Sequence, residues 1–273
     1  MKKTILFCAL FMLFVGSMNF AQTYYVDPAG TNDGSHGSGL GANAWATINF
    51  AISQVSSGAT INVAAGTYVE NVVVNKAISL MGAGANVTSI VATTANNTPL
   101  VISTSNSLVD GFTITHDYTP AELSAWNFNN NGVTFNPSTS GNTISNCVVT
   151  LNRNGIYLNT CQNNIITDNA VINNRTGINM TGTIDGTVIT NNTISDNWTI
   201  GIVTYYISNT TNYSTITITG NTFDNNWYSE ILIKDASANS GTLDVSSNTF
   251  TDSPVTYSTS SNTSFNEEKV SLL

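Results

Sequence analysis

Short apolar triplets rich in β-branched residues, separated by polar turns, recur along most of the chain. Five segments align with one another: "ISNCVV" from 144, "ITDNAV" from 166, "ITNNTI" from 189, "ITGNTF" from 218 and "VSSNTF" from 245. Each starts with an aliphatic residue and serine or threonine, and each has asparagine in fourth place except the first, which has Cys147. Successive segments begin 22, 23, 29 and 27 residues apart. A period in the twenties, made of short strands, is typical of a solenoid.

The pattern favours one kind of solenoid. Helical solenoids need long runs with a 3.6-residue period, and leucine-rich repeats need a leucine framework; the chain has neither. We therefore predict an all-β parallel β-helix in which each period is one coil and coils stack at about 4.8 Å. The recurrent asparagines, such as Asn169 and Asn192, are expected in tight turns, in the left-handed conformation, with their amides bonded from coil to coil.

The N-terminal part predicts a cap for this solenoid. In "NAWATINFAISQVSSG" (43–58) the apolar residues recur on one helical face before a glycine ends the helix. Such a short amphipathic helix would cover the first coil. Opening strands are predicted over Thr60–Val63, Val72–Val74 and Ile78–Met81.

Two features resemble a known superfamily. The stretch "AWATINFAISQVSSGATINVAAGTYVENVVVNKAISLMGAG" (44–84) resembles the N-terminal entry of the pectin-lyase-like, right-handed parallel β-helix superfamily. The segments "NRNGIYL" and "NRTGINM" resemble its coil repeats. The resemblance implies a right-handed solenoid. It does not imply one activity, since the superfamily includes lyases, hydrolases, esterases, epimerases and non-enzymatic adhesins.

The first 21 residues have the pattern of a secretory signal peptide. Two lysines precede an apolar run from Ile5 to Val15, and small and polar residues follow up to Ala21. The run is too short to span a bilayer as a helix. We expect a protein that is secreted, or held at the cell surface or in the periplasm. The predicted parts are a signal peptide (1–21), an N-terminal strand, loop and capping helix (22–58), β-helix coils (59–256), and a tail or truncated C-terminal cap (257–273).

The negative net charge of the chain limits the classes of molecule that it is expected to bind. Only 8% of the residues are charged, and the net charge of −9 becomes −11 when Lys2 and Lys3 are removed with the signal peptide. Such a surface repels nucleic acid and anionic lipid, so neither is an expected partner, and no later segment is apolar enough to insert into a membrane. Cys147 and Cys161 either pair in an oxidising compartment or remain as buried thiols. The oligomeric state is not predicted.

A second row of asparagines lies five residues beyond the fourth place: Asn152, Asn174, Asn197 and Asn226. Equal offsets predict the same corner of each coil. The residues that follow them are Arg153, Arg175, Trp198 and Trp227, which we call the corner row. Stacked in register, the corner row would span about 14 Å, three steps of about 4.8 Å.

The corner row suits an extended glycan. Aromatic faces stack on sugar rings, and guanidinium groups bind carboxylates or sulfates through two parallel hydrogen bonds. We therefore predict an extracellular polysaccharide as ligand, bound by the corner row and Tyr228. Further edge residues would be Tyr205, Tyr206, Asp196 and Glu230. Alternatively, the row only shields the corner, with arginine over tryptophan as an ordinary cation–π contact.

Residues 115–131 interrupt the period between the regular coils and a looser copy, "VDGFTI" from 109. The same offset in the looser copy would add Asp117 to the asparagines and Tyr118 to the row, and the last segment would add Ser253 and Pro254. His116 beside Asp117 could act as a general base, but we favour a solvated loop histidine.

No catalytic motif is complete, so the sequence does not decide whether the protein is an enzyme. Hydrolases need clustered aspartates, which the chain lacks, and "GTYVE" (66–70) resembles an esterase element but belongs to the opening coil. A lyase would use Arg153 or Arg175 as base, and Ca²⁺ to neutralise a uronate. The acids considered as its ligands are Asp168, Asp196 and Asp224, with Asp185 as a further acid. Without lyase activity no cofactor is expected.

Three functions follow from the sequence: a polysaccharide-binding protein, a polysaccharide lyase or related carbohydrate-active enzyme, and a structural or adhesive solenoid without a small-ligand site.

Overall fold

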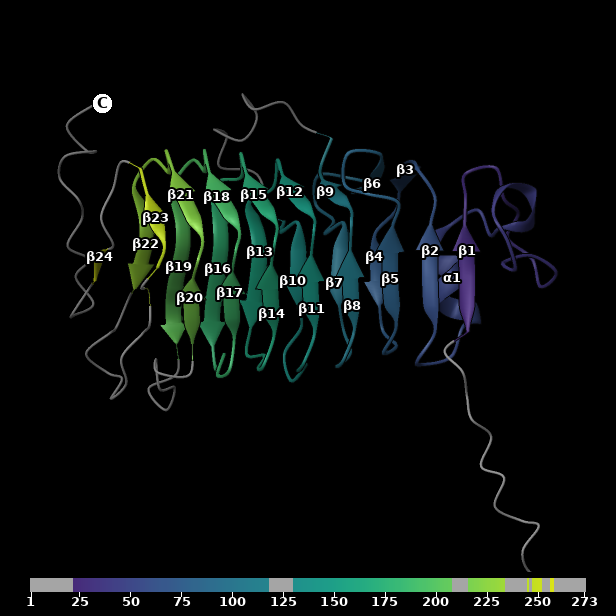
Figure 1. Ribbon diagram of the computed structural model, residues 1–273, viewed down its shortest axis with the longest axis horizontal. Helices are drawn as coiled ribbons and strands as arrows, with labels where there is room; N and C mark the ends of the chain where they lie inside the picture. Colours follow the sequence, from purple (N-terminus) through teal and green to yellow (C-terminus); the bar gives the residue numbers. More distant parts are fainter. Residues whose placement is uncertain are drawn as a thin grey trace, which may run out of the picture.

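The fold is a solenoid of three parallel sheets that run along one axis (Figure 1). The computed structural model describes residues 22–117, 130–207, 216–233, 245, 247–251 and 256–257. The predicted signal peptide and almost all of the predicted tail lie outside these residues. Within them the prediction of a parallel β-helix is confirmed.

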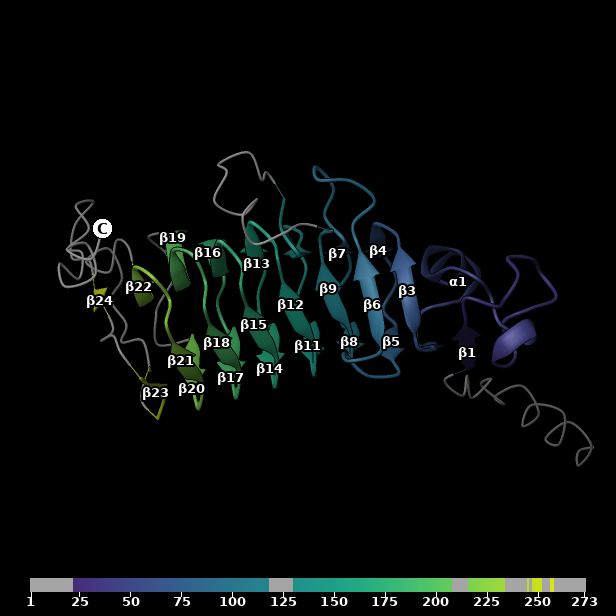
Figure 2. The ribbon, with the colours of Figure 1, turned by 90° about the horizontal axis from the view of Figure 1, so that it is seen from above.

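Each coil contributes one strand to each sheet. Sheet A contains β1 (Thr23–Val26), β2 (Thr60–Val63), β5 (Ser79–Gly82), β8 (Leu108–Asp110), β11 (Thr143–Ser145), β14 (Ile165–Thr167), β17 (Val188–Thr190) and β20 (Thr217–Thr219). Sheet B contains β3 (Gly66–Val69), β6 (Thr88–Val91), β9 (Thr113–Thr115), β12 (Val148–Thr150), β15 (Ala170–Ile172), β18 (Thr193–Ser195), β21 (Thr222–Asp224) and β23 (Thr249–Phe250). Sheet C contains β4 (Val72–Val74), β7 (Leu100–Ile102), β10 (Val133–Phe135), β13 (Asn154–Asn159), β16 (Thr176–Gly182), β19 (Ile200–Ile207), β22 (Ser229–Ile233) and β24 (Thr256–Tyr257). Figure 2 shows sheet B crossing between sheets A and C.

One inward side chain from each strand forms an apolar column inside the solenoid. In sheet A the column runs through Ile144, Ile166, Ile189 and Ile218, which are paired in register and have no exposed surface. Sheets B and C build equivalent columns around Val171 and Ile178. The β-branched residues of the repeat are therefore its core, because parallel sheets of this kind are covered on their inner face.

The helix α1 (Ile48–Gln54) covers the first coil, as predicted, and the 3₁₀ turn η1 (Gly41–Asn43) precedes it. Its buried residues are Ile48, Ala51 and Ile52. The carboxylate of Glu70 accepts hydrogen bonds from the backbone N–H groups of Ile48 and Asn49, at 2.8 and 3.0 Å, and so satisfies two free donors at the helix N-terminus. The last residue of "GTYVE" therefore has a structural role.

Three of the strand predictions can be compared with the structure directly. The predicted strands 60–63 and 72–74 coincide with β2 and β4. The third begins at Ser79 rather than Ile78, one residue later than predicted.

A column of glycines brings neighbouring coils close together where sheet C begins. Gly155, Gly177 and Gly201 lie at equivalent places in β13, β16 and β19. A Cβ atom on Gly177 would lie 2.4 Å from the carbonyl oxygen of Gly201 and 3.1 Å from Nδ2 of Asn197. Only glycine fits this place.

We expect Gly177→Ala to lower the free energy of unfolding by about 1–3 kcal/mol, because the added methyl group overpacks rigid backbone. The measurement is urea unfolding followed by circular dichroism. Gly34→Ala is the matched control, since a Cβ there meets nothing within 4 Å. Equal stability of the two variants would contradict the close approach of the coils.

Candidate functional site

Two corners of the solenoid are tight turns with the same design. At the corner between sheets A and B, the residue in the left-handed conformation precedes the ladder position: Asn146 (φ 52°), Asp168 (57°) and Asn191 (57°). At the corner between sheets B and C, Asn173 (54°) and Asp196 (56°) take this place. The expectation that the ladder asparagines themselves are left-handed is therefore wrong. The preceding residue makes the turn, which frees the ladder side chain to point inward.

The A–B ladder joins five coils through Cys147, Asn169, Asn192, Asn221 and Asn248. The Oδ1 atom of Asn192 accepts hydrogen bonds from N–H and Nδ2 of Asn169, at 2.9 and 3.0 Å. Asn192 in turn donates twice to Asn221. The predicted coil-to-coil bonding of these amides is confirmed.

The B–C ladder consists of His116, Asn152, Asn174, Asn197 and Asn226, so the second row of asparagines predicted from equal offsets is also confirmed. Each of the first three asparagines donates from N–H and Nδ2 to Oδ1 of the next coil, as Asn174 does to Asn197 at 3.0 and 3.2 Å. All side-chain amides thus point the same way. Their oxygen end faces the N-terminal coils and their N–H end faces the C-terminal coils.

Two ionisable residues close the ends of the B–C ladder. At the oxygen end, Nδ1 of His116 lies 2.7 Å from Oδ1 of Asn152 and Nε2 lies 2.7 Å from the carbonyl oxygen of Asn97. At the N–H end, the fully buried carboxylate of Glu230 accepts from Nδ2 of Asn226. A histidine ring nitrogen thus meets the oxygen end of the aligned amides, and a carboxyl group accepts at the N–H end.

Three predictions are corrected by this ladder. His116 is only 3% exposed, so it is a buried ladder residue and not a solvated loop histidine. His116, rather than Asp117, takes the ladder place in the looser copy, because its turn is one residue shorter. Asp117 is exposed directly after it. Tyr118, Ser253 and Pro254 lie outside the described residues. Glu230 is fully buried and does not line the edge of the corner row.

The burial of His116 has a consequence for stability. Burial lowers the pKa of His116, while its hydrogen bonds with Asn152 and Asn97 raise it, and burial has the larger effect. A histidine with a lowered folded-state pKa binds fewer protons when folded than when unfolded, so stability is lost as pH falls below about 6.5, its ordinary pKa.

We therefore expect the unfolding free energy to fall between pH 7 and pH 5, and expect His116→Asn, which continues the asparagine ladder, to weaken this dependence. The measurement is chemical unfolding at a series of pH values. The same pH dependence in parent and variant would show that other groups cause it.

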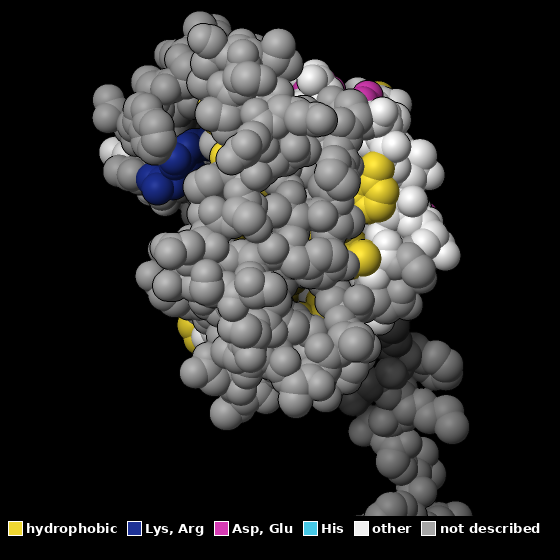
Figure 3. Space-filling view, turned by 90° about the vertical axis from the view of Figure 1, so that its left-hand side faces the viewer, with side chains coloured by type: hydrophobic (Ala, Val, Ile, Leu, Met, Phe, Trp, Pro, Cys, Tyr) yellow, Lys and Arg dark blue, Asp and Glu magenta, His cyan; other side chains and the backbone are white. Residues whose placement is uncertain are grey.

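The corner row lies directly after the B–C ladder, on the outside of the corner, and is stacked in register. The backbone N–H groups of Arg175, Trp198 and Trp227 donate to the ladder asparagine of the preceding coil at 2.9, 2.7 and 3.1 Å. Trp198 is 49% exposed and Trp227 is 41% exposed, whereas Arg153 and Arg175 are half-buried. From the end where β22 lies, Figure 3 shows the visible Lys and Arg side chains as one group at one edge.

The tryptophan coils differ from the arginine coils by one residue. Two residues lie between Asn174 and Gly177, but three lie between Asn197 and Gly201, and the extra residue is Thr199. Thr199 Oγ1 is 2.9 Å from Thr176 Oγ1, and its carbonyl oxygen accepts from the N–H of Tyr228. The turn is therefore wider beside the tryptophans.

Tyr228 extends the aromatic surface. Its ring centroid lies 6.3 Å from that of Trp227, at an interplanar angle of 44°. Burial raises the pKa of Tyr228 to about 12. The side chains of Tyr205 and Tyr206 lie outside the described residues.

The acids predicted as lyase ligands are distributed over different corners. Asp168 lies at the A–B corner and Asp185 between sheets C and A, whereas Asp196 and Asp224 adjoin the corner row. Among the residues that the structure describes, no three His, Cys, Asp or Glu side chains group closely enough to hold a metal ion. Asp168 and Asp185 therefore lie at other corners than Arg153 and Arg175, whereas Asp196 and Asp224 lie at the same corner as the arginines.

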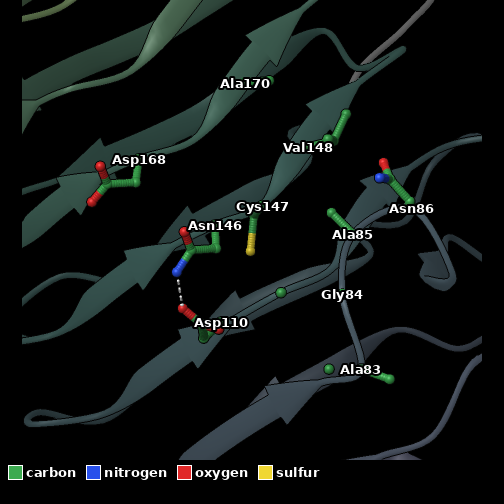
Figure 4. Close-up of a pocket in the computed structure, with 12 residues that line it drawn as sticks. Ala83, Gly84, Ala85, Asn86, Asp110, Asn146, Cys147, Val148, Asp168 and Ala170 are labelled. Atoms are coloured by element: carbon green, nitrogen blue, oxygen red, sulfur yellow. Dashed lines mark hydrogen bonds between the residues drawn. The ribbon is translucent and has the colours of Figure 1, made fainter.

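A pocket of about 520 Å³ lies at the A–B corner, away from the corner row (Figure 4). Its lining comprises Gly82, Ala83, Gly84, Ala85, Asn86, Asp110, Gly111, Asn146, Cys147, Val148, Asp168 and Ala170. Asp110 Oδ2 accepts from Ser145 Oγ and Asn146 Nδ2, both at 2.6 Å, so this carboxylate holds the turn of the next coil. The pocket is lined mainly by small residues, and its two acidic lining residues are Asp110 and Asp168.

The two cysteines are buried free thiols. Cys147 is in the A–B ladder, and Cys161 lies between sheets C and A. Burial raises the pKa of each to about 12. Of the two alternatives for this pair, the structure supports buried thiols.

The comparisons with known proteins agree with this architecture. Residues 124–270, more than half of the chain, match the family described as right handed beta helix region. The chain belongs to this family. A search of curated proteins finds no significant match to this β-helix.

Solved structures share the fold. A pectin methylesterase in complex with hexasaccharide VII is 16% identical, with 75% of this chain and 67% of that one covered and a TM-score of 0.55. Pectin methylesterase PemA from Erwinia chrysanthemi gives the same identity and coverage and a TM-score of 0.54. Pectate lyase Pel9A is 14% identical over 80% of this chain and 69% of that chain, with a TM-score of 0.53. The predicted right-handed, pectin-lyase-like fold is confirmed.

Membrane insertion was not expected, and within the described ranges no helix is long and apolar enough to cross a bilayer.

Proposed function

We propose that this β-helix binds an extracellular polysaccharide along the corner row. The observation that carries the proposal is the exposure of Trp198 and Trp227 at equivalent places of two consecutive coils. Arg153 and Arg175 continue the same line on the two preceding coils.

The chemistry of the row fits a glycan. Large aromatic rings bury the apolar faces of sugars, and guanidinium groups recognise planar anions through two hydrogen bonds. Four coils at about 4.8 Å each give a line about 14 Å long, which suits an extended chain. Tyr228 would add a contact beside Trp227.

The fold is compatible with this partner, since one structure of the same fold is a pectin methylesterase with a bound hexasaccharide. The predicted signal peptide would place the protein outside the cytoplasm, in secretion, at the cell surface or in the periplasm. The acidic composition argues against nucleic acid.

The alternatives receive less support from the site. A lyase would use Arg153 or Arg175 with Ca²⁺, but the described acids do not form a cluster beside them. His116 and Asp117 are no better placed as a pair, because His116 is buried in the ladder. Two tryptophans on consecutive coils, each nearly half exposed, favour a binding surface over a purely structural row.

The test is binding and turnover of the mature protein on a panel of pectic, alginate-like and neutral polysaccharides, with and without calcium. We expect retardation in affinity electrophoresis by at least one polysaccharide, with no unsaturated product and no new reducing ends. Product release would favour the lyase or a related enzyme. The absence of both binding and turnover would favour the structural solenoid.

A further inference from the structure

The corner row consists of two arginines followed by two tryptophans, and the charge of the neighbouring residues also differs between these two halves. The turn positions on the two arginine coils are Leu151 and Asn173, and the strand-end positions before them are Thr150 and Ile172. None of these is acidic. On each tryptophan coil, one of the same two positions is an exposed aspartate: Asp196 before Trp198 and Asp224 before Trp227.

The two arginines form a cationic half. They occupy the same place on neighbouring coils, about 4.8 Å apart along the axis. Burial lowers the pKa of Arg175, and the nearby charge of Arg153 lowers it further. An anion that contacts both guanidinium groups would relieve this repulsion.

The two aspartates place negative charge on the aromatic half. The backbone N–H of Asp196 donates to the carbonyl oxygen of Asp224 at 3.1 Å, so both acids lie at the same corner on adjacent coils. Asp196 is held outward by Asn225, whose Nδ2 donates to its Oδ1 at 2.8 Å. Asp196 and Trp198 are two residues apart and both are exposed, so the negative charge lies on the same outer corner as the tryptophan.

A glycan with a carboxylate on every sugar would not fit this pattern. Its charges would be attracted at Arg153 and Arg175 but repelled by Asp196 and Asp224, because charges within about 8 Å are incompletely screened at physiological ionic strength. A neutral glycan would stack on the tryptophans but would make no charge-assisted hydrogen bonds to the arginines.

We propose that the corner row selects glycans by their charge, with acidic sugars at Arg153 and Arg175 and uncharged sugars at Trp198 and Trp227. Asp196 and Asp224 exclude carboxylates from the tryptophan half. The ligand is thus a mixed acidic and neutral polysaccharide whose acidic part lies toward the N-terminal coils. This inference rests on the proposed function.

The experiment measures affinity for one polymer at three charge densities: unesterified, half methyl-esterified and fully methyl-esterified polygalacturonate. We expect the parent to bind the half-esterified form most tightly. Asp196→Asn combined with Asp224→Asn should tighten binding of the unesterified form about tenfold, roughly threefold for each removed repulsion. Arg153→Gln combined with Arg175→Gln should abolish the preference for half-esterified over fully esterified polymer.

Asp33→Asn is the control, since it removes an exposed carboxylate on the N-terminal loop, far along the chain from the row. It should leave all three affinities unchanged. Tightest parent binding to the unesterified form, or no gain from the two asparagine substitutions, would overturn charge selection while glycan binding stands. A parent that binds another polysaccharide but none of the three forms would overturn it as well. Failure to bind any glycan would overturn the proposed function and this inference together.

Discussion

The Asn197→Ala variant is expected to lose about 3–5 kcal/mol of unfolding free energy, and to unfold with reduced cooperativity along the solenoid. Asn197 Oδ1 accepts two hydrogen bonds from Asn174, and its Nδ2 donates to Asn226 and to the carbonyl oxygen of Val171. Alanine would leave these buried groups without partners, and each such group costs about 1–3 kcal/mol. Urea unfolding measured by circular dichroism gives the value.

Thr193→Ser serves as the control for this prediction, because Thr193 is an exposed strand residue on the same coil. Its effect should stay within about 0.5 kcal/mol. If Asn197→Ala were equally mild, water would have to replace the amide at no cost, and the ladder would not be a major source of stability.

Changing both Trp198 and Trp227 to Ala is expected to weaken polysaccharide binding at least a hundredfold, with each single substitution costing at least tenfold. Exposed tryptophans that become buried on binding commonly contribute about 2 kcal/mol or more, and 1.4 kcal/mol corresponds to a factor of ten. The measurement is isothermal titration or affinity electrophoresis with the polysaccharide that the parent binds best.

Leu40→Ala is the matched control, since it also removes a large exposed apolar side chain, 56% exposed, from a different part of the molecule. It should bind as the parent does. Because both tryptophans are exposed, the double variant should keep the parent's unfolding midpoint. A folded double variant that bound at parental affinity would remove the corner row from the binding surface.

The fold could be predicted from sequence because the aliphatic positions of the repeat are the residues that form the core. The aliphatic first position of each segment, such as Ile166, points inward, and the asparagine in the fourth place reaches the neighbouring coil. Both depend on local geometry repeated at a fixed offset. The left-handed residue of each turn was harder to predict. Asn, Asp, Ser and even Leu151 take that position, so the residue type does not determine which residue has a positive φ.

The site could be predicted only in part. Equal offsets were enough to find the four residues of the corner row, because the ladder keeps the coils in register. They could not reveal that His116 replaces an asparagine, since its coil is one residue shorter. Nor could they show that Glu230 is buried, because its role depends on the end of a ladder and not on its sequence neighbours. The extra residue Thr199 can be found by comparing the spacing of the coils in the sequence. That it widens the turn could be seen only from its contacts with the neighbouring coils.

The position of Glu230 also bears on where the B–C ladder ends relative to the stacked strands. It stands in β22 at the place that Gly155, Gly177 and Gly201 hold in the preceding coils, and the recorded pairing of β22 with β24 begins only at Leu232. The side chain of Glu230 folds back onto Asn226 and accepts from its N–H and Nδ2, which takes the place that an amide oxygen of a following coil would otherwise hold. Glu230 closes the described part of the B–C ladder, yet β23 and β24 still pair with the strands of the coil before them. The chain of amides and the stacking of strands therefore need not end at the same coil.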